Sequence, residues 1–319
     1  MWIPLKKLTY TLLAACLLIS QCSVMYPIAL AAAPGYSVLD YPENWCLDFD
    51  GINDSVTCGK SNVFNLDYFT IEAWIKPKYN VHAGSDAAYG HTWGCIIHHR
   101  PTTDPQYHGW FIGFNYQDGN LYLLCGFPTY PASVQFHANR PVWYNYTWYH
   151  IAVTYDRGLP TGNVKFIVDG ALDSQHDQNR RIDYDYDATT HIGRHCLNDH
   201  AFGGLIDEVR VWNYSRTLTE IGNTLNRTLS GAEASNSNLV AYWQFDESSG
   251  LIANDSSVQP NDGILGPAAQ SVPAWFWPGA DIIPEYSYLS VTLAIVSLGS
   301  LLCISLVRRK PRKLNGTSA

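Results

Sequence analysis

The chain has 319 residues, a net charge of −8 and a charged fraction of only 15%. This acidic balance, with no basic stripe outside the two termini, argues against a nucleic-acid interface, which needs a basic face. Aromatic residues make up 13% of the chain, and because such side chains suit the half-buried surface of a sheet, the composition favours β-structure.

The N-terminal segment 1–33 is predicted to be a signal peptide. Lys6-Lys7 precedes an apolar run from Leu8 to Ile19, and the small residues ALAAA follow at 29–33. This order of basic, apolar and small-residue regions is typical of secretory signals. We therefore expect the rest of the chain to be exported into an oxidising space, where disulfides form.

The exported body holds an odd number of cysteines: Cys46, Cys58, Cys95, Cys125 and Cys196. Cys46 and Cys58 flank the turn sequence DGIND, so a hairpin at this turn would bring them opposite each other. We therefore predict a Cys46–Cys58 disulfide. Cys95 with Cys125 is the next candidate pair, and Cys196 competes for either of these partners.

Short segments with an alternating or apolar pattern follow one another along the exported body, with turn residues between them. The predicted strands lie at 45–51, 55–59, 69–77, 94–100, 110–116, 121–127, 148–156, 164–172, 190–194 and 202–212. Short strands at regular spacing with turn signals between them indicate a sandwich of two sheets.

The segment 202–221, FGGLIDEVRVWNYSRTLTEI, predicts a strand followed by a short helix that Thr217 caps. Asp207 and Glu208 are adjacent, so in a strand their side chains point to opposite faces. They are therefore not the paired carboxyl groups of a glycosidase, which must face each other. We interpret them as local hydrogen-bonding groups around Arg210.

Six motifs occur in a fixed order, namely LDFDG, FTIEAWIKP, WYHIAVTYD, VKFIVDG, HIG and GGLIDEVRVW. This succession resembles the laminin G-like, concanavalin A-like lectin/glucanase domains over about residues 44–265. The resemblance implies an all-β jelly roll of two antiparallel sheets, which we assign to 40–270. Most such domains bind rather than catalyse, and the E-x-D-x-x-E strand of the glucanase branch is absent here. No catalytic residue is assigned.

The unit at 239–266 resembles one that sits beside the sandwich in this family, and we expect it to complete the same domain. Its residues Asp246, Asp255, Asn261 and Asp262 offer the hard oxygen ligands that calcium prefers. Family members often place calcium near loops of this kind, so these four are the candidate metal ligands. The alternative interpretation is that they only form turns through bonds to their own backbone.

The C-terminal part reads as a membrane anchor. Residues 271–287 form a Pro- and aromatic-rich stalk, and 288–307 form an apolar run long enough to span a bilayer. The basic tail 308–319 should stay on the cytoplasmic side, which predicts a single-pass type I surface protein with its body outside. Pro284-Glu285 before the span also resembles tails processed by archaeosortases or exosortases, so a processed anchor is the alternative.

Two aromatic loops, 79–93 and 127–149, suit a sugar, which presents an apolar face and a rim of hydroxyls. The candidate ligand-binding residues are Tyr79, Tyr89, Trp93, Tyr130, Trp143 and Tyr146. Sequons that fit a surface glycoprotein occur at Asn53, Asn145, Asn213, Asn226 and Asn254. We expect a non-catalytic module that recognises carbohydrate or a surface protein, with calcium as the candidate ion. A carbohydrate-active enzyme and a structural envelope protein are the alternatives.

Overall fold

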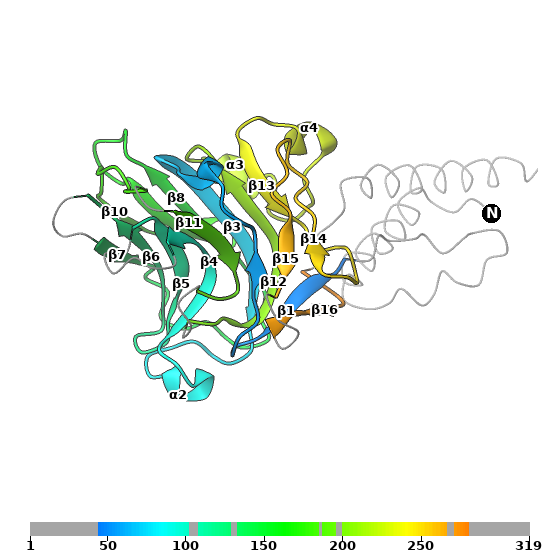
Figure 1. Ribbon diagram of the computed structural model, residues 1–319. Helices are drawn as coiled ribbons and strands as arrows, with labels where there is room; N and C mark the ends of the chain where they lie inside the picture. Colours follow the sequence, from blue (N-terminus) through cyan, green and yellow to red (C-terminus); the bar gives the residue numbers. More distant parts are fainter. Residues whose placement is uncertain are drawn as a thin grey trace, which may run out of the picture. The chain divides into compact units, whose positions relative to one another are not determined.

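A computed structural model describes residues 44–101, 108–128, 133–184, 187–195, 200–266 and 271–280. The predicted signal peptide, the predicted span, the basic tail, Tyr130 and Cys196 lie outside these ranges. No helix within the described ranges is long and apolar enough to cross a membrane. The described residues form two antiparallel sheets stacked as a sandwich (Figure 1). The expected all-β jelly roll is therefore confirmed.

The first sheet contains the longest strands. Its members are β1 (Cys46–Asp50), β3 (Tyr68–Pro77), β8 (Tyr149–Asp156), β9 (Val164–Val168), β10 (Ala171–His176), β12 (Gly203–Trp212), β13 (Leu239–Trp243) and β16 (Ala274–Phe276). They are ordered β10-β9-β8-β3-β12-β1-β16, and β13 also pairs with β12. The predicted closing strand β12 thus lies inside the sheet, between β3 and β1.

The second sheet packs against the first. Its members are β2 (Val56–Thr57), β4 (Trp93–Pro101), β5 (Trp110–Asn115), β6 (Asn120–Gly126), β7 (Ser133–His137), β11 (Ala188–Ile192), β14 (Ile252–Ala253) and β15 (Gly263–Leu265). The order is β14-β15-β2-β11-β4-β5-β6-β7. The 239–266 unit therefore adds strands to both sheets.

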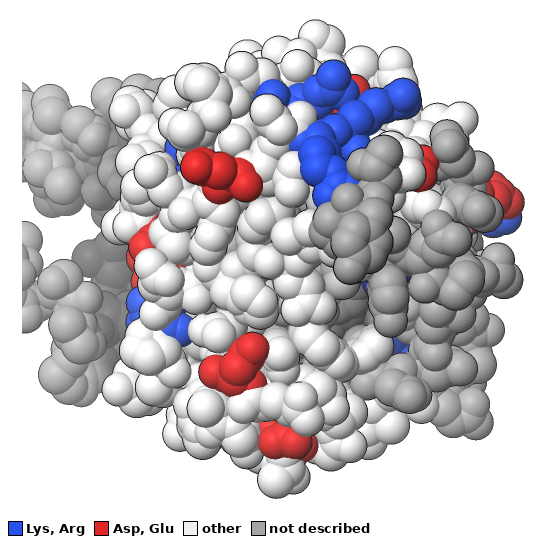
Figure 2. All heavy atoms as spheres, turned by 90° about the vertical axis from the view of Figure 1, so that its left-hand side faces the viewer, with Lys and Arg blue, Asp and Glu red and all other residues white. Residues whose placement is uncertain are grey.

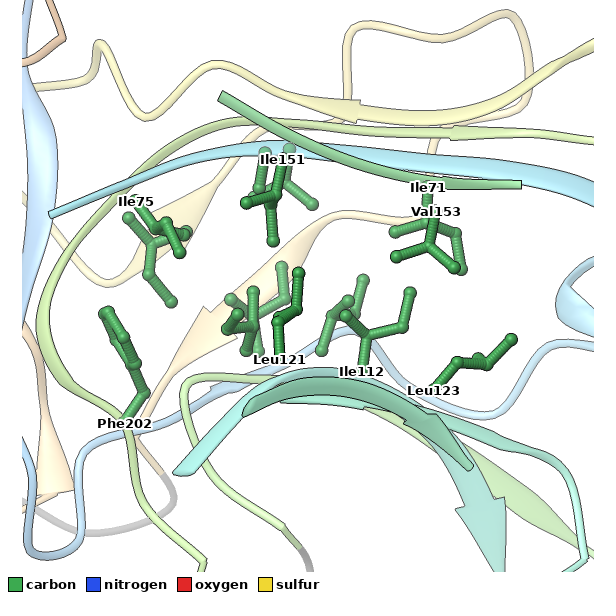
Figure 3. Close-up of a cluster of buried hydrophobic side chains, with 14 of the residues drawn as sticks. Ile71, Ile75, Ile112, Leu121, Leu123, Ile151, Val153 and Phe202 are labelled. Atoms are coloured by element: carbon green, nitrogen blue, oxygen red, sulfur yellow. The ribbon is translucent and has the colours of Figure 1, made fainter. Parts of the chain in front are cut away.

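The core lies between the sheets. Figure 3 shows Ile71, Ile75, Ile151 and Val153 of the first sheet pointing toward Ile112, Leu121 and Leu123 of the second. All of these side chains are at most 3% exposed. Alternation along β3 explains the arrangement, since Ile71 and Ile75 face the core while Lys76 faces outward. Each such buried aliphatic side chain contributes about 1.5–3 kcal/mol to folding.

Helical segments are short: a 3₁₀ turn η1 (Asn62–Phe64), α2 (Asp86–Tyr89), α3 (Leu218–Gly222) and α4 (Gly231–Ala234). The predicted cap of α3 is confirmed. The Thr217 hydroxyl accepts a hydrogen bond from the Glu220 amide, and the Glu220 carboxylate accepts one from the Thr217 amide. This reciprocal capping box satisfies donors that the first helical turn leaves unpaired.

Asp207 and Glu208 lie at a bulge of β12, where the register against β3 shifts. Glu208 has a positive φ of 51°. Its carboxylate accepts hydrogen bonds from Arg210 and from the hydroxyl of Tyr242, and Asp207 accepts one from the backbone amide of Ala280. These side chains are fully buried, and the interpretation of the pair as structural is supported by their partners.

The predicted Cys46–Cys58 disulfide is wrong. Cys46 lies on β1 of the first sheet and Cys58 directly follows β2 of the second, so the turn between them carries the chain from one sheet to the other. Both thiols are free and buried, as are those of Cys95 and Cys125. Cys125 packs in the main core, whereas Cys95 packs in a separate cluster on the other face of the second sheet.

Three further elements differ from expectation. The segment 164–172, taken as one strand, holds β9 and the start of β10, with Asp169 at a positive φ of 51° between them. Strand β7 lies in the loop 127–149 that we reserved for ligand binding. Residues 274–276, expected in the stalk, form β16 and pair with β1. Short edge strands such as these carry too few residues for their periodicity to be recognised.

Figure 2 shows the side of the domain on which β7 and β10 lie in Figure 1. Charged side chains are sparse there. Lys and Arg gather at one corner, and Asp and Glu stand apart from one another. The described residues visible on this side therefore present mainly uncharged groups to solvent.

Candidate functional site

An open cavity of about 670 Å³ lies where three loops meet. We call it the loop cavity. Its lining residues come from the turn after β1, from the stretch between α2 and β4, and from one histidine: Gly51, Ile52, Tyr89, Gly90, His91, Thr92, Trp93 and His200. The lining combines aromatic rings with groups that can donate or accept hydrogen bonds, which is the composition of small-molecule sites.

The wall of the loop cavity is held in place by ring stacking. Tyr89 stacks on Tyr116 with 3.8 Å between the ring centroids and 6° between the ring planes. The Tyr89 hydroxyl donates a hydrogen bond of 2.8 Å to the Tyr79 carbonyl. His91 donates one of 2.8 Å to the Gly51 carbonyl, so it joins two of the three loops. A wall with so many internal contacts is pre-organised for a ligand.

Trp93 is the partly exposed ring of the loop cavity. Its ring meets Tyr122 edge-on at 4.9 Å and His200 edge-on at 6.0 Å. His200 is positioned by backbone pairing, since its carbonyl accepts hydrogen bonds from the amides of Cys95 and His195. The rings at this mouth are therefore fixed by β4 and by the segment that returns to it.

A row of histidine rings leads away from the loop cavity along the outer face of the second sheet. We call His191, His98, His195 and His200 the histidine row. Successive ring centroids are 5.2, 4.8 and 5.4 Å apart, and Phe111 packs against three of the four rings. The sheet register sets this up, because His191 pairs with His98 and His98 pairs with Phe111.

Burial keeps three rings of the histidine row, those of His98, His191 and His195, uncharged. Loss of hydration lowers the pKa of His98 well below its ordinary value, that of His195 to about 3 and that of His191 to about 4. These imidazoles are therefore neutral at pH 7, with one nitrogen that donates and one that accepts. Among the described residues, no three His, Cys, Asp or Glu side chains are grouped so as to hold a metal ion.

Replacing His195 with Gln is expected to flatten the loss of stability in acid. Because the folded pKa of His195 lies below its ordinary value of 6.5, the unfolded chain takes up the proton first as the pH falls. The contribution of neutral His195 to the free energy of unfolding is therefore complete above pH 6.5 and is lost as the pH falls toward the folded pKa. Between pH 6.5 and pH 4.5 the protein with His195 should lose about 2 kcal/mol more stability than the His195→Gln variant.

The measurement is urea unfolding of the unmodified protein and of the His195→Gln variant at pH 6.5 and at pH 4.5. The matched control is His82→Gln, which changes an exposed histidine and should leave the difference between the two pH values unaltered. An equal acid loss in His195→Gln and in the unmodified protein contradicts the prediction.

The predicted ligand-binding residues do not form a single site. Tyr89 and Trp93 line the loop cavity, and Tyr79 meets Tyr89 edge-on at 5.2 Å. Trp143 is wrong as a ligand residue, because it is fully buried in the core. Tyr146 is 68% exposed but lies at a different groove.

Other residues of the site were missed or left unassigned. Ile52 and His200 were not singled out, and neither were the rings of Phe111 and Tyr122 on the second sheet. The alternation along β5 and β6 offered the signal for these two rings, because it places them on the face opposite to Ile112 and Leu121.

The side chains of the four candidate calcium ligands form hydrogen bonds mainly with backbone atoms. The Asp255 carboxylate accepts hydrogen bonds from the amides of Tyr242, Ser257 and Asn261. Asp262 accepts from the amide of Asp255, and Asp246 accepts from that of Trp45 on another segment. Of these carboxylate bonds, only the one from Ser257 is a local turn bond of the kind that was weighed against calcium, whereas the bond from Trp45 joins two distant segments.

Comparisons with known proteins agree with the sandwich fold. Residues 50–222 match the sequence profile of the Concanavalin A-like lectin/glucanases superfamily. No functionally curated protein matches the chain. A candidate carbohydrate-binding protein from Bacteroides ovatus has a similar structure, with a TM-score of 0.50 and 21% identity over 73% of this chain. The match spans 62% of the Bacteroides ovatus chain.

Two more distant structures are also similar. A heptameric SAP-like pentraxin from Limulus polyphemus has a TM-score of 0.39 and 13% identity, over 58% of this chain and 82% of its own. The CBM40 domain of a Ruminococcus gnavus IT-sialidase, bound to α2,3-sialyllactose, has a TM-score of 0.41 and 16% identity. That match covers 55% of this chain and 95% of the CBM40 chain.

Proposed function

The chain belongs to the concanavalin A-like lectin/glucanase superfamily, and from this membership we propose that it is a non-catalytic module that binds carbohydrate in the loop cavity. The cavity itself is the observation that carries the proposal. Its volume of about 670 Å³ lies inside the range typical of ligand sites, roughly 300–1,000 Å³. The Bacteroides ovatus protein of similar fold is a candidate for the same ligand class.

The chemistry of the lining supports a sugar. Trp93 offers a partly exposed ring for the apolar face of a pyranose, and Thr92, which also lines the cavity, carries a hydroxyl that can hydrogen-bond to the sugar. Gly90 has a left-handed φ of 76° at the end of α2 and turns the chain toward the cavity without a side chain of its own. A ligand can therefore approach the backbone closely at this point.

Binding is favoured over hydrolysis by the absence of acids from the lining. A glycosidase needs two carboxyl groups beside the scissile bond, and none of the described residues that line the loop cavity is Asp or Glu. The exported location is part of the same proposal. The predicted signal peptide would export the module and the predicted span would hold it at the cell surface, where a glycan or a surface protein would be its ligand.

Replacing Trp93 with Ala is expected to weaken glycan binding at least tenfold, because a central aromatic anchor supplies much of the energy of such a contact. A glycan array run with the purified chain identifies the ligand, and titration calorimetry then measures the variant. Tyr144→Ala is the matched control, since Tyr144 is 59% exposed and lines neither cavity.

Each arm of this experiment has a defined outcome. Binding to no glycan, or equal binding by the Trp93 and Tyr144 variants, rejects the proposed site. Turnover of a polysaccharide rejects the non-catalytic assignment. The array repeated with a chelator tests calcium: if Asp246, Asp255, Asn261 and Asp262 hold the ion, chelation should weaken binding and added calcium should restore it.

A further inference from the structure

A second hollow lies on the outer face of the first sheet. We call it the outer groove. It encloses about 160 Å³ and is lined by Asp48, Lys76, Lys78, Tyr146, Gly204, Leu205 and Phe276. These residues come from β1, β3, β12 and β16 and from the segments after β3 and before β8, so most of the groove rests on a rigid sheet. It shares no lining residue with the loop cavity.

Alternation along the strands places the charged side chains in this groove. On β1, Leu47 and Phe49 enter the core, so Asp48 between them points outward. On β3, Ile75 enters the core and Lys76 points outward. The register then places Leu205 of β12 between them, because it pairs with both Lys76 and Asp48.

The charged side chains of the outer groove can still form hydrogen bonds and ion pairs with a ligand. Among the residues that the structure describes, the side chains of Asp48, Lys76 and Lys78 take part in no hydrogen bond or ion pair. The Lys76 ammonium lies 5.5 Å from the centre of the Trp148 ring, and that of Lys78 lies 5.9 Å from the centre of the Tyr79 ring. Each ammonium therefore keeps its three donors for a ligand.

Aromatic rings complete the groove. Tyr146 is 68% exposed and Phe276 is 40% exposed. Tyr146 has a left-handed φ of 53°, an uncommon conformation for a bulky residue, and its amide donates a hydrogen bond of 2.9 Å to the Pro77 carbonyl. The backbone thus holds the ring at the groove at a cost in strain, an arrangement that is frequent at binding sites.

We propose that the outer groove binds one acidic sugar residue. Two ammonium groups against one carboxylate give the groove a net positive charge, although the whole chain carries −8. The exposed Tyr146 and Phe276 rings suit the apolar face of a pyranose, and Asp48 can accept hydrogen bonds from its hydroxyls. The volume equals that of about five waters at roughly 30 Å³ each, which suits a single ring and not a long chain.

The test is a ligand-observed NMR titration of the full chain with three probes: methyl galacturonide, methyl galactoside 6-sulfate and methyl galactoside. Both acidic probes are expected to bind at least tenfold more tightly than the neutral one, and added salt should weaken them. Preference for only one acidic probe distinguishes a carboxylate from a sulfate ligand, and either result supports the groove.

Two variants separate recognition from structure. Lys76→Met with Lys78→Met should reduce the affinity for the acidic probes at least tenfold. Asp48→Asn should strengthen binding of the acidic probes by removing a like charge, and should leave the neutral probe no tighter. A variant that merely disturbed the fold would not strengthen binding of the acidic probes while leaving the neutral probe no tighter.

The outcomes are independent of the loop cavity. Trp93→Ala should leave titration of the acidic probes unchanged, so failure of the loop cavity proposal does not remove this one. Equal affinity for acidic and neutral probes overturns the proposal. So does binding of the chain to vesicles with anionic lipid without binding to either acidic sugar, because the aromatic and basic groups would then serve a membrane surface.

Discussion

Replacing Glu72 with Gln is expected to lower the free energy of unfolding by about 3–5 kcal/mol, because it leaves a buried arginine without its counter-charge. Glu72 lies on the outer face of β3 and is fully buried. Its carboxylate accepts a hydrogen bond from Arg216 and lies 3.4 Å from the Nε2 atom of His150. Burial disfavours the ionised form of this carboxyl group and so raises its pKa. The His150 hydrogen bond and the Arg216 charge outweigh this effect and hold the pKa at about 2.

The same arginine attaches the segment after β12 to the first sheet. The Arg216 guanidinium donates to the Glu220 carbonyl at 2.8 Å and to the Thr224 hydroxyl at 3.1 Å, and it lies 4.4 Å from the centre of the Trp212 ring. Loss of Glu72 should therefore loosen α3 as well as the strand. Urea unfolding measures the total, and hydrogen exchange should show faster exchange in α3.

Glu233→Gln is the matched control. Glu233 accepts two hydrogen bonds of 2.7 Å from Arg227, but both side chains are partly exposed, so the change should cost about 1 kcal/mol or less. The double change Glu72→Leu with Arg216→Met should recover much of the loss, because it removes both buried charges. If Glu72→Gln costs no more than Glu233→Gln, the buried pair is not a main support of the domain.

Replacing Gly193 with Ala is expected to cost about 3 kcal/mol or more. Gly193 follows β11 with a φ of +84°, and an added Cβ would lie 2.0 Å from the Phe49 ring, which is fully buried. Overpacking typically costs about 1–3 kcal/mol, and a left-handed backbone adds roughly 1–2 for a residue with a side chain. The change should also weaken glycan binding, since the segment that carries His200 begins here.

Gly59→Ala measures the cost of backbone strain alone, so the difference between Gly193→Ala and Gly59→Ala gives the packing contribution. Gly59 has a φ of +72°, but an added Cβ would meet nothing within 4 Å, so only the backbone strain of about 1–2 kcal/mol remains. Thermal unfolding of both variants gives the difference between their losses of stability. Combining Gly193→Ala with Phe49→Leu should recover part of the stability lost in Gly193→Ala. Equal losses at the two glycines would show that the Phe49 ring moves aside freely.

The strongest sequence predictions concerned segments whose pattern repeats over many residues. Ile71 and Ile75 alternate with Glu72 and Lys76 along ten residues of β3, and the structure confirms both faces. The Thr217 cap was also readable, because a capping box involves only neighbours in the chain. Features of this kind depend on residues that are close together in the sequence, so the sequence alone predicts them.

The wrong predictions for Trp143 and for the disulfide required knowledge of which segments meet in space. The residue type of Trp143 indicates a large flat ring, but whether that ring faces the core depends on Phe114 and Tyr149, which pack around it. The spacing of Cys46 and Cys58 suggested a hairpin, yet their strands pair with partners more than a hundred residues away. Sequence spacing carries no information about such pairing.

The sequence by itself therefore determined the fold class, the order of the main strands and the family. It also supplied the predictions of export, anchoring and calcium. Only the tertiary structure showed the loop cavity and the outer groove, because each is assembled from separate elements. The loop cavity joins the turn after β1 to β4 and His200, and the outer groove joins β1, β3, β12 and β16. The physical reason is that alternation sets which face a side chain takes, whereas sheet register sets its neighbours.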